Sequence, residues 1–274
     1  MNLQEKITIS GLTDTGRVRK KNEDSIGYDS ALGLVVLADG MGGHRGGEIA
    51  SSITVDTIID KIQQQLPQIL PGKIDAETGF SMESICLQNA VEFANKLVYE
   101  TAEANPEHKG MGTTVVALQF YNNTLSLAHI GDSRCYRLRA DKLEQITKDH
   151  SLLQELIDRG FYTPEEARKS MNRNLVTRAL GIDSVVVTDI QEDVVLKNDI
   201  YLLCSDGLTD LVEDEDIYLT ITRFSDNLEV AAKQLITKAN QNGGKDNISV
   251  MLCSIDENFS IRKGWFTKMV AWFD

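Results

Sequence analysis

Residues 113–147 read TTVVALQFYNNTLSLAHIGDSRCYRLRADKLEQIT, and this stretch decides between the possible fold classes. Its apolar or alternating runs are rich in β-branched residues, as is typical of strands. Only a few residues of Asn, Gly, Asp and Lys separate one run from the next. Links this short join antiparallel neighbours, because a parallel connection needs a dozen or more residues. The stretch therefore predicts an antiparallel meander.

Further strands are expected on both sides of this stretch, at residues 7–12, 32–38, 200–204 and 248–255. Helical spacing of apolar residues follows residue 47 and recurs at 81–104 and 228–241. The strands and helices are mixed along the chain, and the strands are largely antiparallel. This pattern favours an α+β fold, with helices layered on antiparallel sheets, over a doubly wound parallel sheet.

Length and charge limit the classes of function. At 274 residues, the chain has room for one large domain or two small ones. Its 28 basic and 41 acidic residues give a net charge of −13, which argues against a general nucleic-acid surface. The start, MNLQEKITISG, lacks the features of a secretory signal, and no apolar run approaches the ~18 residues of a transmembrane segment. We therefore expect a cytoplasmic protein.

The cysteines indicate neither a disulfide framework nor a zinc site. Cys86, Cys135, Cys204 and Cys253 are far apart, and none belongs to a C-x-x-C pair. We expect reduced thiols, as in a cytoplasm. None has an arginine six positions later, as a cysteine-nucleophile phosphatase loop requires, and no G-x-x-x-x-G-K-[ST] nucleotide loop is present.

Carboxylates recur where apolar strands begin or end, commonly beside glycine. They are Asp39, Asp132, Asp206 and Asp246, to which RKKNEDS adds Glu23 and Asp24. Buried together, like charges would raise one another's pKa and destabilise the fold. A divalent cation would resolve that conflict, and oxygen ligands favour Mg²⁺ or Mn²⁺ over zinc. A single Asp-Gly is far more often a turn, so the prediction of a metal site depends on the whole set.

The stretch VLADGMGGHRGG at 36–47 places Asp39 at the end of a buried strand and before five glycines. These glycines permit backbone conformations that are closed to other residues. A tight turn between strand and helix is one interpretation. A site for a cation or a phosphate is the other, and Asp39 alone does not decide between them.

Six segments occur in an order that marks a known family: GRVRKKNEDS, VLADGMGGHRGGE, GMGTTVVAL, AHIGDSRCYR, LLCSDGLTD and GGKDNISV. Together they resemble the PPM/PP2C family of metal-dependent serine/threonine protein phosphatases, in its compact bacterial form. The resemblance spans roughly residues 7–255. It implies a four-layer αββα sandwich of two antiparallel sheets flanked by helices, with a phosphatase domain over residues 1–255.

The resemblance also implies a metal centre with two ions, Mn²⁺ or Mg²⁺. The ligands carried over are Asp24, Asp39, Asp206 and Asp246, with Asp39 bridging the ions and the carbonyl of Gly40 as a further ligand. Asp132 matches the ligand of a third, weaker ion. The implied reaction is hydrolysis of phosphoserine and phosphothreonine in proteins by a metal-activated water, opposing a cognate bacterial serine/threonine kinase.

Two further residues match the family's catalytic groups. Arg19 matches the phosphate-binding arginine, and His44 matches the proposed general acid. Glu23 is expected to orient ligands or water. Other interpretations stay open, because Arg19 stands in a basic cluster and His44 has a packing role as its alternative. His129 and His150 are expected to be structural.

Residues 151–180 resemble the mobile helical flap of bacterial members. The flap cations are Arg168, Lys169, Arg173 and Arg178, which would meet an acidic phosphopeptide or lie on a solvated helix surface. Two alternatives to a protein phosphatase remain. One is a non-catalytic regulator that binds phosphoproteins or kinases, and the other is a metal-dependent hydrolase of small phosphate esters.

Residues 256–274 form an extension beyond the resemblance. A helix at 264–273 would place six apolar side chains on one broad side: Trp265, Phe266, Met269, Val270, Trp272 and Phe273. Such a face needs a cover, which would be the protein's own domain, a partner chain or a membrane interface. Packing on its own domain is the expectation we place first.

Overall fold

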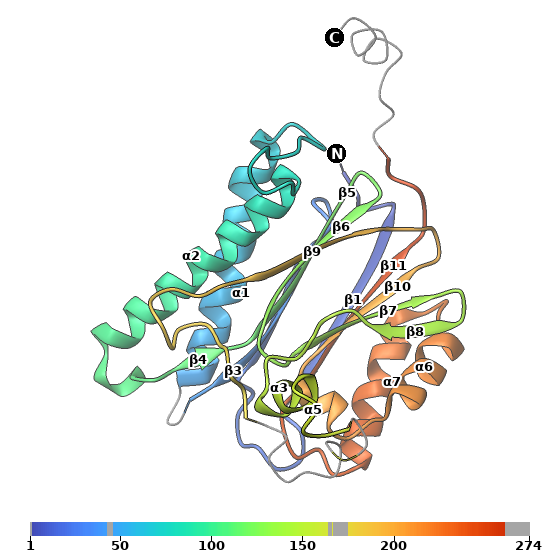
Figure 1. Ribbon diagram of the computed structural model, residues 1–274. Helices are drawn as coiled ribbons and strands as arrows, with labels where there is room; N and C mark the ends of the chain where they lie inside the picture. Colours follow the sequence, from blue (N-terminus) through green and yellow to red (C-terminus); the bar gives the residue numbers. More distant parts are fainter. Residues whose placement is uncertain (1, 43–45, 164–165, 167–174, 261–274) are drawn as a thin grey trace, which may run out of the picture.

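The structure, a computed structural model, describes residues 2–42, 46–163, 166 and 175–260. Two antiparallel sheets lie face to face, and helices cover the outer face of each (Figure 1). The predicted α+β sandwich of four layers is therefore confirmed. In the described part of the chain, no helix is both long enough and apolar enough to cross a membrane.

Each sheet combines strands from distant parts of the chain. In spatial order, the first sheet holds β1 (Ile7–Asp14), β11 (Ile248–Ile255), β10 (Ile200–Cys204), β7 (Arg134–Arg139) and β8 (Lys142–Gln145). The second holds β2 (Asp24–Asp29), β3 (Leu34–Met41), β5 (Val115–Tyr121), β6 (Thr124–Ile130) and β9 (Asp189–Val194), while β4 (Gly112–Thr113) pairs with β3. Strands β2 and β9 are absent from the predicted set, because they carry many polar residues and no apolar run.

Long helices form the two outer layers. The second sheet is covered by α1 (Gly46–Gln65) and α2 (Met82–Ala104), and the first by α6 (Asp214–Arg223) and α7 (Leu228–Gln241). The shorter elements are η2 (Leu66–Gln68), η3 (Pro106–His108), α3 (Leu152–Asp158) and α5 (Asp206–Thr209). The starts of α2 and α7 are fixed by N-caps, since Ser81 Oγ and Asn227 Oδ1 each accept a backbone N–H from the first turn at 3.1 Å.

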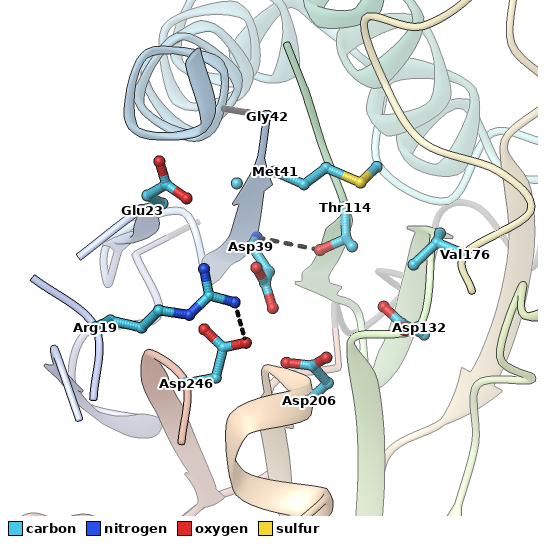
Figure 2. Close-up of a pocket in the computed structure, with 11 residues that line it drawn as sticks. Arg19, Glu23, Asp39, Met41, Gly42, Thr114, Asp132, Val176, Asp206 and Asp246 are labelled. Carbon is cyan, nitrogen blue, oxygen red and sulfur yellow. Dashed lines mark hydrogen bonds and ion pairs between the residues drawn. The ribbon is translucent and has the colours of Figure 1, made fainter. Parts of the chain in front are cut away.

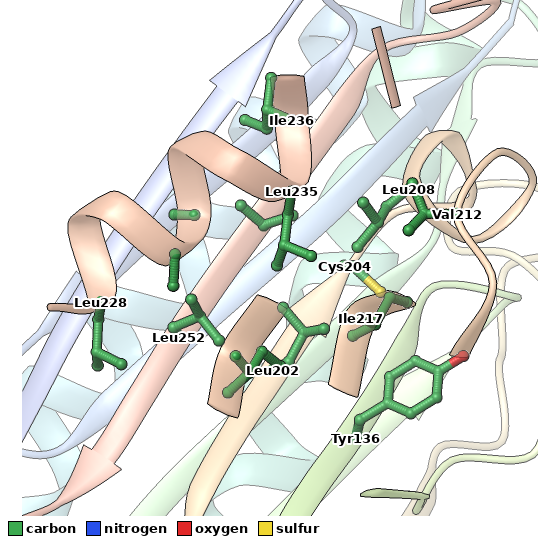
Figure 3. Close-up of a cluster of buried hydrophobic side chains, with 14 of the residues drawn as sticks. Tyr136, Leu202, Cys204, Leu208, Val212, Ile217, Leu228, Leu235, Ile236 and Leu252 are labelled. Atoms are coloured by element: carbon green, nitrogen blue, oxygen red, sulfur yellow. The ribbon is translucent and has the colours of Figure 1, made fainter. Parts of the chain in front are cut away.

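Three apolar layers hold the sandwich together. On β3, Val35 and Leu37 point between the sheets, whereas Leu34 and Val36 point toward α1 and α2. This strand is buried on both faces, which explains its continuous apolar run. Figure 3 shows the third layer, where Leu202 and Leu252 of the first sheet pack under the helices on its outer face.

The predicted single meander is wrong at residues 131–133. Asn122 and Asn123 join β5 to β6 with φ of 44° and 56°, which is the geometry of a type I′ hairpin. After β6, however, Gly131 to Ser133 carry the chain from the second sheet to the first, where β7 pairs with β8 and β10. A short link requires only that the strand ends be close, and it does not require the strands to pair. The crossing places Asp132 between the two sheets.

The domain continues beyond residue 255, where the sequence analysis placed its end. Phe259 is buried between the sheets, and Asp256 accepts a hydrogen bond from Thr8 Oγ1 at 2.6 Å. Residues 256–260 therefore belong to the sandwich. The remainder of the predicted extension, residues 261–274, lies outside the described residues.

Candidate metal centre

The strand-end carboxylates meet at one end of the sandwich. Asp39 lies near the end of β3 and is paired in register with Asp24 at the start of β2. Asp206 follows β10, Asp246 precedes β11, and Asp132 lies in the link between β6 and β7. A hollow of about 520 Å³ opens there, lined by Arg19, Glu23, Asp39, Gly40, Met41, Gly42, Thr114, Asp132, Val176, Asp206 and Asp246 (Figure 2).

Hydrogen bonds with Thr113 and Thr114 hold the backbone of Asp39 in place. Its N–H donates to Thr114 Oγ1 at 3.1 Å, and its carbonyl accepts the N–H of Thr114 at 2.8 Å and the hydroxyl of Thr113 at 2.9 Å. The Thr114 hydroxyl also bonds to Ser133 Oγ at 2.7 Å. Thr114 therefore ties Asp39 to the link that carries Asp132. The sequence analysis did not single out Thr114, although it stands in the quoted segment GMGTTVVAL.

The resemblance makes Asp24 a metal ligand and Glu23 a residue that orients ligands or water, and the structure places the two side chains differently with respect to the hollow. Glu23 lines the hollow. Asp24 is buried behind its wall, where Oδ2 accepts hydrogen bonds from Ser205 Oγ at 3.0 Å and Ser249 Oγ at 2.6 Å. Its other oxygen, Oδ1, is buried with no hydrogen-bond partner in the described part of the chain. Asp24 is thus a candidate ligand through Oδ1 alone, and Glu23 faces the hollow directly.

Glycine is required at Gly40 because the backbone of two other segments comes close. A Cβ on Gly40 would lie 2.2 Å from the carbonyl oxygen of Gly47 and 2.4 Å from that of Glu23. The start of α1 and the Glu23 segment therefore pack directly against the end of β3. This contact brings Glu23 beside Asp39.

The cluster carries strong mutual repulsion. Burial raises the pKa of Asp39 well above its ordinary value, and the charges of Asp24, Asp206, Asp132 and Asp246 raise it further. The pKa of Asp206 is also raised by burial first and then by its acidic neighbours. Burial raises the pKa of Asp132 to about 6, with the charge of Asp149 acting in the same direction.

These residues fit a hard divalent cation. The donor set consists of carboxylates with the carbonyl of Gly40 beside them, which are the ligands that Mg²⁺ and Mn²⁺ prefer. The orphaned Oδ1 of Asp24 and the raised carboxyl pKa values show that the side chains alone do not neutralise the site. One or more cations at this place would supply that charge.

Arg19 is the cation of the hollow. Its Nη2 donates to Asp246 Oδ2 at 2.7 Å, and half of its side chain is exposed (Figure 2). Its segment is anchored by Asn247, which the sequence analysis missed. The side-chain amide of Asn247 donates to the carbonyls of Thr15 and Lys21, and its Oδ1 accepts the N–H of Glu23. His44, the predicted general acid, lies outside the described residues.

Residues 175–178 of the predicted flap lie at the same end of the molecule. The prediction of helix throughout 151–180 is wrong for the described residues, because helix α3 ends at Asp158 and residues 175–180 are not helical. Val176 lines the hollow and forms an isolated bridge with Ser151, and the N–H of Thr177 donates to the carbonyl of His150 at 2.8 Å. Arg178 Nη1 pairs with Asp189 Oδ1 at 2.9 Å, and its side chain remains partly exposed to solvent. The other predicted flap cations, Arg168, Lys169 and Arg173, lie outside the described residues.

His129 and His150 form a support beneath the flap. Their rings stack with centroids 4.5 Å apart, and burial lowers the pKa of both. His150 Nδ1 accepts the N–H of Gly131 at 3.1 Å, which leaves the proton on Nε2, beside Asp189 Oδ2 at 3.2 Å. The possible ligand atoms of the two rings and Asp189 lie within 4.8 Å of one another, but His150 already uses its one lone pair, on Nδ1, to accept the N–H of Gly131. The cluster is therefore structural.

Comparisons with known proteins agree with this geometry. A sequence profile of the family described as Protein phosphatase 2C matches residues 17–242. The serine/threonine phosphatase stp of Listeria innocua is 36% identical over 243 residues, which cover 88% of this chain and 92% of that protein. A crystal structure of the catalytic domain of serine/threonine protein phosphatase PstP in complex with two manganese ions has a TM-score of 0.79 at 36% identity, covering 92% of this chain and 99% of the other.

The fold is thus an αββα sandwich, and the carboxylates at one end of it are suited to bind divalent metal ions. The chain belongs to the protein phosphatase 2C family. The serine/threonine protein phosphatase PstP of Mycobacterium tuberculosis is 40% identical over 243 residues, which are 89% of this chain. The match covers only 44% of the length of that relative.

Proposed function

We propose that this chain is a metal-dependent protein phosphatase that hydrolyses phosphoserine and phosphothreonine. The observation that carries the proposal is the hollow itself, in which Asp39, Asp206, Asp246 and Asp132 from both sheets converge beside Arg19. A non-catalytic regulator would need no such set, and in this chain all of the predicted ligand carboxylates are present.

We assign separate roles in the proposed reaction to the predicted metal ligands, to Arg19 and to His44. Two divalent ions, when bound by Asp24, Asp39, Asp206, Asp246 and the Gly40 carbonyl, would supply a water of lowered pKa as the nucleophile and offset charge on the phosphoryl group. Arg19 binds phosphate oxygens through its planar guanidinium and turns from Asp246 to do so. His44 protonates the departing alkoxide, since a histidine pKa lies near neutrality.

A second hollow supports a protein substrate rather than a small phosphate ester. It measures about 610 Å³ and shares Met41 and Val176 with the metal centre. Its wall carries exposed apolar side chains, including Ile182, Val185 and Val187. A small ester would leave this surface in water, whereas the residues beside a phosphoserine in a peptide would cover it.

Finer points of the proposal follow from the same site. Asp132 would hold a third, weaker ion at the sheet crossing, and either Mn²⁺ or Mg²⁺ suits the oxygen ligands. The proposed partners are phosphoproteins and the serine/threonine kinase that phosphorylates them. The four cysteines are free and buried: Cys86, Cys135, Cys204 and Cys253. Free thiols support localisation in a reducing cytoplasm.

The decisive experiment compares phosphopeptides with small phosphate esters under Mn²⁺, Mg²⁺ and EDTA. We expect hydrolysis of phosphoserine and phosphothreonine peptides only with a divalent metal, and its near loss in Asp39→Asn and Asp206→Asn. The exposed Asp226→Asn is the matched control and should retain activity. Full turnover in EDTA would refute the metal-dependent mechanism, and preference for small esters would refute the substrate class.

A further inference from the structure

A second apolar pocket lies at the opposite end of α1 from the metal centre. It has a volume of about 130 Å³ and is lined by Leu3, Leu32, Leu66, Pro67, Ile69, Pro71, Glu83, Phe120, Tyr121 and Asn122. Helix α1 begins at Gly46 beside the metal centre and ends at Gln65, where η2 and the pocket follow. A helix of this length spans roughly 30 Å. The pocket is therefore separate from the proposed chemistry.

The pocket combines an apolar wall with one unsatisfied acceptor. Glu83 is buried at 2% exposure, and its Oε1 accepts the N–H of Gly72 at 2.9 Å. Its Oε2 is buried without a hydrogen-bond partner among the described residues. Leu70 and Ile74, beside the pocket in sequence, are 72% and 57% exposed. An occupant that fits needs a large apolar body and a single N–H donor.

The described chain ends close to this pocket. The N–H of Phe259 donates to Asn123 Oδ1 at 2.6 Å, and Asn123 Nδ2 donates to Asn258 Oδ1 at 2.8 Å. Asn123 directly follows the pocket residues Phe120, Tyr121 and Asn122. Phe259 also packs in the same buried cluster as Leu3 and Phe120. The described chain therefore ends, at Ser260, close to the residues that line the pocket.

We propose that the C-terminal segment 261–274 docks in this pocket of its own domain and inserts Trp265 beside Glu83. Trp265 is five residues after Ser260, which allows a reach of roughly 17 Å in extended chain. The indole offers both required features, because its rings are apolar and its one N–H donates to a carboxylate. Docking would cover the exposed Leu70 and Ile74. It would also bring a donor to Oε2 of Glu83, which is closed to solvent in the free pocket and must turn toward the indole to accept its N–H.

Tryptophan fluorescence tests the proposal directly, since both tryptophans of the chain, Trp265 and Trp272, lie in this segment. The full chain carrying Trp272→Phe reports on Trp265 alone. We expect blue-shifted emission and quenching by acrylamide several-fold weaker than for an exposed tryptophan. Glu83→Gln replaces the acceptor by an amide donor without changing side-chain shape, and Pro71→Arg blocks the rim of the pocket. Each should shift the emission to the red and restore quenching.

The matched control is Glu229→Gln, an exposed glutamate on α7 over the other sheet, which should leave Trp265 protected. Phosphopeptide hydrolysis should be unchanged in every variant, because the pocket is far from the metal centre. Equal quenching in wild-type and pocket variants would overturn the proposal. So would protection that depends on protein concentration, which indicates a second copy, or protection that appears only with anionic phospholipid vesicles.

Discussion

Replacing Asp24 by asparagine should stabilise the metal-free protein. Asp24 is buried, and burial raises its pKa from 3.8 to about 6 despite the hydrogen bonds from Ser249 and Ser205. At 1.36 kcal/mol per pKa unit, a rise of this size corresponds to about 3 kcal/mol of stability lost when the carboxylate is ionised. In Asp24→Asn the side-chain oxygen keeps both serine donors, and the amide nitrogen can donate to Asp39. The free energy of unfolding should therefore rise by about 3 kcal/mol at pH 7.5.

The pH dependence has a definite sign. Above pH 6 the folded protein holds an ionised, poorly solvated Asp24, so the penalty is fully present. Between about pH 6 and 3.8 the folded protein takes up a proton while the unfolded chain remains ionised, and the penalty disappears. The gain in Asp24→Asn should accordingly shrink as the pH falls through this window.

Urea unfolding in EDTA at pH 7.5 and pH 4.5 measures this difference, with the exposed Asp226→Asn as the control that should change stability at neither pH. A destabilised Asp24→Asn protein at pH 7.5 would refute the reasoning. A gain of the same size at both pH values would refute it as well, because it would have a cause other than the buried charge.

Three other substitutions probe the site and its frame. In steady-state kinetics, Arg19→Ala should raise KM for a phosphopeptide more than it lowers kcat. The control Lys20→Ala, at the neighbouring basic residue, should change neither. A loss in kcat alone for Arg19→Ala would contradict the binding role. His44→Ala should lower kcat for a phosphopeptide more than for nitrophenyl phosphate, whose leaving group needs little protonation, and equal losses would remove His44 from the acid role. Gly207→Ala would place a Cβ 1.9 Å from the carbonyl oxygen of Asn247. The free energy of unfolding measured in urea should therefore fall by about 1–3 kcal/mol. An unchanged midpoint would show that the backbone at Asn247 moves to make room for the methyl group.

The sandwich was predictable because its central strands are buried on both faces. The strands Leu34–Met41 and Ile248–Ile255 can be recognised in the sequence by their apolar runs. The strands β2 and β9 cannot be recognised in this way, since they lie at the two edges of the second sheet, where polar residues are tolerated. The sheet crossing at Gly131 was also hidden, because a three-residue link looks the same whether the next strand pairs or departs.

The carboxylates of the metal centre were predictable as a set, but their individual places were not. Asp39 and Asp206 stand at the ends of recognisable strands, so their convergence follows from the fold. Whether Glu23 or Asp24 faces the hollow depends on how the chain enters β2, which starts at Asp24, and on the serines behind Asp24. Sequence spacing alone does not contain that information.

The carboxylates that line the hollow come from distant parts of the sequence, from Glu23 before β2 to Asp246 before β11. A ribosome releases the N-terminal residues first. A growing chain therefore exposes Asp39 long before Asp246 has been made, and a partly translated copy lacks a carboxylate that the site requires. The proposed phosphatase activity would therefore begin only after the last strand has entered the first sheet, and an unfinished chain on the ribosome would not act on the proposed phosphoprotein substrates.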